Sequence, residues 1–251
     1  MPAGLDGNAN PVVTAARTRV LELVTSKVVA IEAGRPVLVG IDGASGSGKS
    51  TFADELAGTI AAATARIAVR ASIDSFHQPR ARRYRRGAES AEGYYRDSHD
   101  LPALEEHLLD SFRTGAGTFR RGIFDEPADQ ARYESAEPVR ADSILVFDGL
   151  FLHRDELVEY WDLTVFLIAE ARREMAWQSY LTTDLPHDPA ARDAEIARRV
   201  TRARRERYVE GQALYEREAA PQLRADVVID NDDLAHPRVI AGAVTRRRPT
   251  H

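Results

Sequence analysis

Short apolar runs, each followed by glycine or polar residues, predict the strands of a buried sheet. The runs are rich in Val, Ile, Leu and Phe, as expected where both faces of a parallel sheet are covered. They predict strands over 36–42, 65–73, 143–149, 162–168 and 225–231.

Between these runs, apolar residues recur three and four positions apart, which is the spacing along one face of an α-helix. This spacing predicts helices over 11–33, 49–63 and 101–115, another from about residue 170, and a long arginine-rich helix within 189–219, interrupted near Pro186 and Pro189. Residues 78–100 show no clear period and are predicted to be irregular, and 232–251 is predicted to be a frayed tail.

The alternation of strands and helices favours an α/β fold with a mostly parallel sheet between two helical layers. The pattern divides the chain into an N-terminal helix within 1–34, one α/β domain over 35–232 and a tail over 233–251. In such sheets, ligands bind outside the carboxyl ends of the strands. Polar motifs that directly follow a strand are therefore the candidates for chemistry.

Composition narrows the class of protein. The 251 residues are 43% hydrophobic and carry a formal net charge of −5, which argues against a general affinity for nucleic acid. The chain has no cysteine, and its sequence shows neither a signal peptide nor an apolar membrane span. We expect a cytoplasmic protein that binds neither nucleic acid nor membrane, and the sequence leaves open whether it is a homo-oligomer.

The segment GASGSGKS, residues 43–50, matches the phosphate-binding P-loop pattern G-x-x-x-x-G-K-[ST] between a predicted strand and a predicted helix. Its glycines let backbone N–H groups turn towards phosphate oxygens. Only two of the 34 basic residues are lysines, and one is Lys49, which would reach the β- and γ-phosphates. The alternative is a flexible turn, but the strand–loop–helix context favours a site for ATP. The predicted nucleotide-binding residues are Gly43, Ala44, Ser45, Gly46, Ser47, Gly48, Lys49, Ser50 and Thr51.

Two aspartates follow predicted strands and should lie at the same edge of the sheet as the P-loop. Asp148 ends the run SILVFD and is expected to hold Mg²⁺ together with the hydroxyl of Ser50, although an aspartate here also suits a turn or helix cap. Asp74 ends the second predicted strand and would accept the proton of an attacking hydroxyl; the alternative is that it caps the turn that follows.

Two absences favour phosphoryl transfer over hydrolysis. The N-K-x-D element of guanine-specific GTPases is missing, because no lysine follows Lys49. Motor-type ATPases usually carry a glutamate after the metal-binding aspartate, whereas here Gly149 follows Asp148. Transfer to a bound acceptor is the more consistent interpretation.

The segments GASGSGKST, IDSFHQPR, YYRDSHDLPALEEHLL, ILVFDGLFL and ADVVIDN occur in the order found in the uridine kinase/phosphoribulokinase family of P-loop kinases. The chain resembles this family over about 36–232, and within it the actinobacterial uridine kinase-like proteins. The resemblance implies a P-loop NTPase fold with three αβα layers and a helical, arginine-bearing lid, at about 184–212 here. It also implies Mg²⁺-dependent transfer of the γ-phosphoryl group of ATP to a primary hydroxyl of a small molecule.

The same resemblance assigns roles to single residues. It makes Asp74 the general base and places Asp148 where the family has a metal-serving glutamate. The family's nucleoside-contacting tyrosine is His77 here, and its base-reading histidine is Asp129, so a donor is replaced by an acceptor and base preference should change. The residues assigned to the acceptor are His77, Asp97 (through ribose hydroxyls), Phe124, Asp125, Asp129 and Tyr208.

The arginine-rich segment 198–208, RRVTRARRERY, has three interpretations. It is a lid whose guanidinium groups neutralise the transferring phosphoryl group, with Arg204 and Arg207 as the favoured catalytic pair. It is a solvated helix face paired with glutamates at helical spacing. Or it binds nucleic acid, which the net acidity of the chain disfavours.

The sequence therefore predicts a cytoplasmic kinase that uses ATP and Mg²⁺, most simply a uridine or cytidine kinase-like enzyme that makes a nucleoside 5′-monophosphate. The rival within the same family phosphorylates another small molecule, such as pantothenate, a sugar or a phosphosugar. The rival of a different class is an ATP-binding regulatory or nucleic-acid-associated module.

Overall fold

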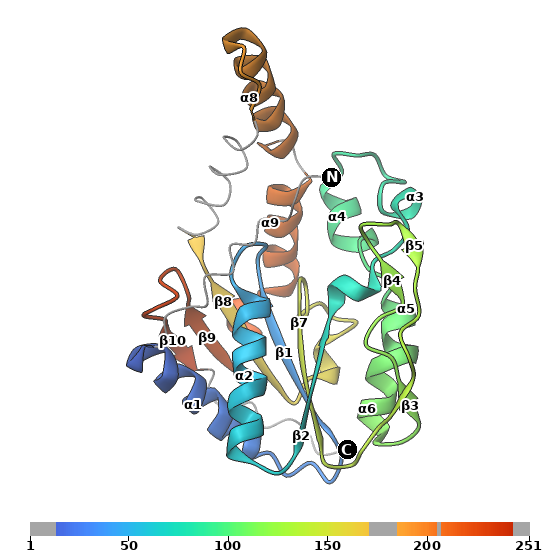
Figure 1. Cartoon of the computed structure of the whole chain (residues 1–251), viewed down its shortest axis with the longest axis vertical. Helices are drawn as coiled ribbons and strands as arrows, with labels where there is room; N and C mark the ends of the chain where they lie inside the picture. Colours follow the sequence, from blue (N-terminus) through green and yellow to red (C-terminus); the bar gives the residue numbers. More distant parts are fainter. Residues whose placement is uncertain (1–13, 171–184, 205–206, 243–251) are drawn as a thin grey trace.

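The computed structural model of the chain describes residues 14–170, 185–204 and 207–242. A six-stranded sheet lies between two layers of helices (Figure 1). The strand order is β10-β9-β8-β1-β7-β2, and all neighbours are parallel except β10, which pairs antiparallel with β9. The strands are β1 (Val37–Gly43), β2 (Ile67–Ser72), β7 (Ser143–Gly149), β8 (Leu163–Ile168), β9 (Val227–Asp230) and β10 (Arg238–Gly242).

The five predicted strands are confirmed, and the α/β fold class with them. The prediction of a frayed tail is wrong for residues 238–242, which form the antiparallel edge strand β10. This strand has only a short apolar run, with Val239 and Ile240 exposed, so it lacks the buried pattern that reveals the parallel strands.

Alternating side chains of the strands pack on opposite faces of the sheet. Val37, Val39 and Ile41 of β1 join the core beneath α1 (Ala15–Val29) and α2 (Lys49–Ala63). Leu38 joins the core on the other face, beneath α5 (Leu101–Leu104) and α6 (Asp110–Thr114). A third cluster covers the same face near β8 and β9 with residues of α4 (Ala91–Asp97) and α9 (Tyr208–Ala219). The sheet is thus buried on both sides, which explains its continuous apolar strands.

The helices follow the predicted periodicity in most places. The helix predicted at 49–63 is α2 with those bounds, and the one predicted at 101–115 runs from α5 through a π-helical turn, η2 (Glu105–Leu109), to α6. It ends at Gly115, whose φ of +69° terminates it. The remaining short elements are η1 (Ile73–Phe76), α3 (Arg80–Arg83), η3 (Val158–Tyr160), α10 (Pro221–Arg224), and the strand pairs β3 (Thr118–Phe119) with β6 (Glu137–Pro138) and β4 (Phe124–Asp125) with β5 (Gln130–Ala131).

Two regions differ from the prediction. The segment 78–100 is not irregular throughout, because α3 and α4 lie within it. The long helix predicted within 189–219 is two helices, α8 (Pro189–Arg204) and α9, and α8 extends beyond the body of the molecule (Figure 1). The helix predicted from about residue 170 falls mainly on residues outside the described ranges. Among the described helices, none is both long and apolar enough to cross a bilayer.

Candidate active site

The P-loop connects the carboxyl end of β1 to the start of α2. Gly43, Gly46 and Gly48 have φ values of +153°, +78° and +84°, which residues with a Cβ rarely adopt. A side chain at position 48 would also lie 2.9 Å from Asn231 Nδ2. The glycines of the motif are therefore required by the conformation of this loop, and the alternative of a generic flexible turn is not needed.

The far side of the P-loop is held by residues distant in sequence. Asn231, directly after β9, donates from Nδ2 to the carbonyl oxygen of Ser47 at 2.8 Å. Arg17 of α1 is 1% exposed; its Nη1 lies 3.4 Å from Asn231 Oδ1, and its Nε donates to Glu55 Oε2 of α2 at 2.7 Å. This buried arginine links α1, α2 and the end of β9 behind the loop.

A second buried network fixes the point where β1 enters the loop. Asp42 is fully buried, and its Oδ1 accepts the backbone N–H of Gly43 at 2.7 Å. Its Oδ2 accepts from the hydroxyl of Tyr215 on α9 and lies 2.7 Å from Nδ1 of His153, which donates because a carboxylate only accepts. Burial and the nearby Asp42 raise the pKa of Tyr215 well above its usual value, so its hydroxyl stays a donor.

Lys49, Ser50 and Asp148 meet at the mouth of the loop. The Lys49 ammonium donates to the carbonyl oxygen of Ala44 at 2.9 Å, and burial lowers its pKa although three aspartates oppose the shift. The Ser50 hydroxyl donates to Asp148 Oδ2 at 2.7 Å, and Arg70 of β2 binds Asp148 Oδ1 at 2.8 Å. The hydroxyl and carboxylate predicted to share a metal ion are thus in contact.

Asp74 is the second residue of η1, which directly follows β2, and it is exposed. Protein atoms on its other sides partly shield it from water, and this desolvation raises the pKa of its carboxyl. His77, Asp148 and Lys49 act on the same carboxyl; Asp148 raises its pKa, whereas His77 and Lys49 lower it. The three groups that the sequence predicts at one edge, Lys49, Asp74 and Asp148, therefore lie within electrostatic reach of one another.

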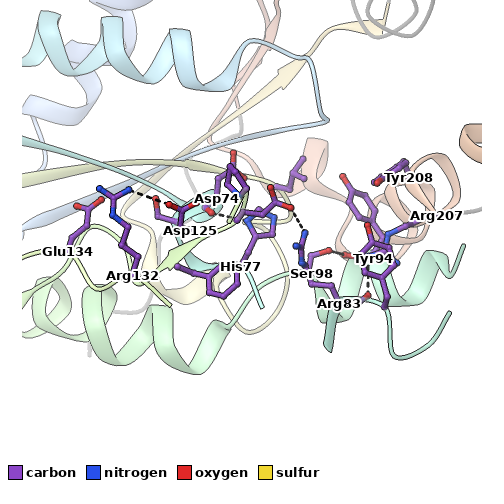
Figure 2. Close-up of a pocket in the computed structure, with 17 residues that line it drawn as sticks. Asp74, His77, Arg83, Tyr94, Ser98, Asp125, Arg132, Glu134, Arg207 and Tyr208 are labelled. Atoms are coloured by element: carbon purple, nitrogen blue, oxygen red, sulfur yellow. Dashed lines mark hydrogen bonds and ion pairs between the residues drawn. The ribbon is translucent and has the colours of Figure 1, made fainter. Parts of the chain in front are cut away.

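A pocket of about 750 Å³ opens beside Asp74 (Figure 2). Residues of α3, α4, the segment 122–134 and the start of α9 form its walls. This volume is typical of sites for small organic molecules. The P-loop, the carboxylates of Asp74 and Asp148, and this pocket therefore lie close to one another.

The comparisons with known proteins agree with this geometry. The chain matches the Phosphoribulokinase / Uridine kinase family over residues 38–210. It belongs to this family. No curated protein matches the chain in a sequence search.

Solved structures share the fold at low sequence identity. "Structure of a Possible Uridine Kinase from Bacillus stearothermophilus" aligns with a TM-score of 0.62 and 23% identity, covering 84% of this chain and 97% of the other. A "putative fructose transport system kinase from Silicibacter sp. TM1040" aligns with a TM-score of 0.59 and 20% identity, covering 81% and 95%. At these low identities, the structural similarity shows that the chain has the same fold as these two proteins.

Membership of this P-loop kinase family implies the use of ATP, typically with Mg²⁺. The residues present fit both. The glycine-rich loop has positive φ at Gly43, Gly46 and Gly48 and leads into the N-terminus of α2, an arrangement suited to binding phosphate. A serine hydroxyl beside an aspartate is an oxygen-rich donor set of the kind that Mg²⁺ prefers.

The structure brings most of the acceptor residues implied by the resemblance into one pocket. His77, Phe124, Asp125 and Tyr208 line the pocket beside Asp74. Figure 2 shows His77 close to Asp74, with Asp125 on the same side and Tyr208 at the opposite end. Four of the six residues thus line one pocket.

Asp97 and Asp129 are not among the residues that line this pocket. Asp97 lines a separate cavity and binds the guanidinium groups of Arg85 and Arg86, with its Oδ1 2.8 Å from Arg85 Nη2. These arginines lower the pKa of Asp97 against the effect of burial. Asp129 has a positive φ of 49° and accepts the backbone N–H of Arg80 at 2.7 Å. Both carboxylates have structural partners, which the resemblance did not reveal.

His77 faces His99 across a short antiparallel contact. Backbone bonds from Gln78 N to Ser98 O (2.9 Å) and from Asp100 N to Phe76 O (2.8 Å) flank the pair, and the ring centroids are 4.7 Å apart. His77 Nδ1 lies 2.8 Å from the carbonyl oxygen of Asp74. The ring of His77 is therefore held in place next to the carboxylate, and burial lowers the pKa of its neighbour His99.

The two arginines predicted for the lid have different positions. Arg204 is the last residue of α8, and its side chain lies outside the described part of the structure. Arg207, the N-cap residue of α9, is 4% exposed and lines the pocket. The roles of Asp42, His153, Tyr215, Asn231 and Arg17 were not predicted from the sequence. For Asp42 a signal was available, because it is a charged residue inside the apolar run of β1.

Proposed function

We propose that this protein transfers the γ-phosphoryl group of ATP to a hydroxyl group of a small molecule held in the pocket beside Asp74. The observation that carries the proposal is the position of Asp74. It is exposed to the pocket on one side, and on the other it interacts electrostatically with Lys49 of the P-loop and with Asp148. A carboxylate between a polyphosphate site and a second pocket is suited to act as a general base.

Each group has a defined task in this mechanism. The P-loop backbone and Lys49 would bind the phosphates, and Ser50 and Asp148 would hold the metal ion. Bound Mg²⁺ would neutralise charge on the phosphate oxygens and orient them. Asp74 accepts the proton of the acceptor hydroxyl, and its raised pKa makes it a stronger base than an ordinary aspartate.

The acceptor class has two candidates. The resemblance implies the 5′-hydroxyl of uridine or cytidine, and the aromatic rings of Phe124, Tyr94 and Tyr208 in the pocket wall support a planar base. However, Asp97, the residue implied to bind ribose, lies in the separate cavity with its two arginines. The positive side chain of Arg207 in the wall favours, within the second candidate, the acceptors that carry an anionic group, such as pantothenate or a phosphosugar. We expect the enzyme to act in the cytoplasm and not to bind nucleic acid.

The variant Asp74→Asn tests the proposal. We expect kcat to fall about 10²- to 10⁴-fold, the contribution typical of a positioned base, with the Kd for ATP changed by less than about threefold. The wild-type rate should fall as the pH is lowered, starting at a higher pH than for an ordinary aspartate, because the pKa of Asp74 is raised. The variant should lose this acidic limb.

The stability of the variant provides the control for misfolding. The pKa of Asp74 is higher in the folded than in the unfolded protein. The stability that this carboxyl contributes is fully present below its unfolded-state pKa and is lost as the pH rises through its folded-state pKa. Removing the charge should therefore leave Tm at neutral pH unchanged or higher. An ATP-binding regulatory module would show no turnover with any acceptor and no effect of Asp74→Asn, and that result would refute the kinase proposal.

A further inference from the structure

Arg207 is a buried cation with an incomplete set of hydrogen bonds. It is 4% exposed, and Nη2 donates to the carbonyl oxygen of Arg83 at 3.1 Å. Within the described residues, Nε and Nη1 have no hydrogen-bond partner, and no carboxylate forms an ion pair with the guanidinium. Burial of an uncompensated charge is costly, so such a group is expected to have a ligand.

The other cations of the pocket wall are already paired. Arg83 binds Glu126 at 2.6 Å, and Arg132 lies 3.5 Å from Asp125. Arg207 lies next to Arg83 and brings a second positive charge to this end of the pocket. The excess positive charge is therefore local, although the whole chain is acidic.

The guanidinium of Arg207 is held in a fixed plane. Its Cζ atom lies over the ring of Tyr84, 4.2 Å from the ring centroid, and 5.9 Å from the ring centroid of Tyr94. Stacking on an aromatic face limits the rotation of the side chain, and a planar guanidinium binds carboxylate or phosphate through two parallel hydrogen bonds. The site is thus organised before any ligand binds.

The position of Arg207 separates it from the reacting phosphate. Figure 2 shows Arg207 with Tyr94 and Tyr208 at one end of the pocket, apart from Asp74 and Asp125. The largest charge effects on Asp74 come from His77, Asp148, Lys49 and Glu126. An anion bound by Arg207 would therefore belong to the acceptor and not to the transferred phosphoryl group.

We propose that the acceptor carries an anionic group, a carboxylate or a phosphate, which Arg207 binds at the end of the pocket opposite the hydroxyl that is phosphorylated. This inference rests on the proposed kinase function and narrows its acceptor to phosphorylated or carboxylated polyols. It also assigns Arg207 to the acceptor instead of to the lid.

Matched pairs of acceptors test the inference. In ribose with ribose 5-phosphate, and in glycerol with glycerate, one primary hydroxyl group of the neutral member is replaced by a phosphate ester or a carboxylate, and uridine is added as the neutral nucleoside. We expect the wild-type kcat/KM for at least one charged member to exceed that of its neutral counterpart and of uridine by tenfold or more. The member that reacts identifies the anion as phosphate or carboxylate. A preference of the wild type for uridine or for the neutral members would overturn the inference.

The variants Arg207→Gln and Arg207→Lys locate the effect. With Gln, the KM for the charged acceptor should rise at least tenfold and that for ATP less than threefold, whereas Lys should restore part of the loss. Arg140→Gln removes one exposed arginine distant from the pocket and should keep the wild-type preference. A rise confined to the KM for ATP would place Arg207 at the donor phosphates and overturn the inference. If Arg207→Gln fails to fold, the acceptor pairs on the wild type decide alone.

A binding measurement separates this inference from the kinase proposal. Inorganic phosphate and glycerate, without ATP, should raise the Tm of the wild type and not that of Arg207→Gln. Protection of the wild type with no turnover on any acceptor would support the anion site and refute the kinase. Turnover on uridine without protection by either anion would do the reverse.

Discussion

The buried network around Asp42 allows a quantitative test of how the P-loop is held. Substituting Tyr215→Phe removes a hydroxyl that donates to Asp42 and accepts the backbone N–H of His153 at 3.1 Å. All three residues are fully buried, so water cannot replace the lost group. The ring remains and keeps its packing against Tyr95 and Phe151.

The expected cost follows from the two lost contacts. A hydrogen bond to a charged group contributes about 1.5–3 kcal/mol, and a buried N–H left without a partner costs about 1–3 kcal/mol. Because the two contacts share one hydroxyl, their effects are not fully additive, and we expect a loss of about 2–4 kcal/mol in the free energy of unfolding. For a chain of this size that corresponds to a fall in Tm of roughly 5–15 °C.

Urea unfolding and thermal melts measure this loss, and Tyr160→Phe is the matched control. The Tyr160 hydroxyl also donates to an aspartate, Asp110, at 2.8 Å, but at the protein surface. Its removal should cost at most about 1 kcal/mol. Since Asp42 holds the N–H of Gly43, Tyr215→Phe should also weaken ATP binding, whereas Tyr160→Phe should not. Equal losses of stability in the two variants would refute the reasoning from burial.

Two further substitutions probe the nucleotide site. Gly48→Ala should lower ATP affinity at least tenfold in a direct binding assay, because the φ of this residue is +84° and the new Cβ would lie 2.9 Å from Asn231 Nδ2. The control is Gly58→Ala in the middle of α2, where the new methyl group has open space around it. This variant should leave ATP affinity unchanged and stabilise the helix by about 0.5–1 kcal/mol. Asp148→Asn should raise the Mg²⁺ concentration for half-maximal activity about tenfold or more. The control is Asp54→Asn, because Asp54 is the exposed partner of the same Arg70, and this variant should change that concentration less than twofold. Equal effects of the two variants would show that Asp148 acts only through Arg70.

Local patterns predicted the parts of the structure that depend on local sequence. The apolar runs predicted the five parallel strands, because strands buried on both faces need continuous apolar residues. The P-loop, Asp74 and Asp148 were found because each directly follows such a run, and a parallel sheet places those ends at one edge. Their electrostatic coupling is consistent with that placement.

The remaining features depend on contacts between distant segments. Asp97 carries a plausible sequence signature for an acceptor ligand, yet Arg85 and Arg86 bind it in a separate cavity. Arg207 lies in an arginine-rich segment, and its packing on Tyr84 and the absence of a carboxylate at its guanidinium within the described chain become visible only in the folded structure. Sequence spacing does not report such partners.

The hydrogen bond from Asn231 to the P-loop has a consequence for folding during biosynthesis. The motif that binds the nucleotide leaves the ribosome early, but Asn231, which holds Ser47, follows it by 184 residues. Until that segment has emerged and β9 has joined the sheet, the loop lacks its rear support. A nascent chain that ends before Asn231 therefore has the complete motif but should bind nucleotide weakly, so tight binding of ATP would mark the completion of folding.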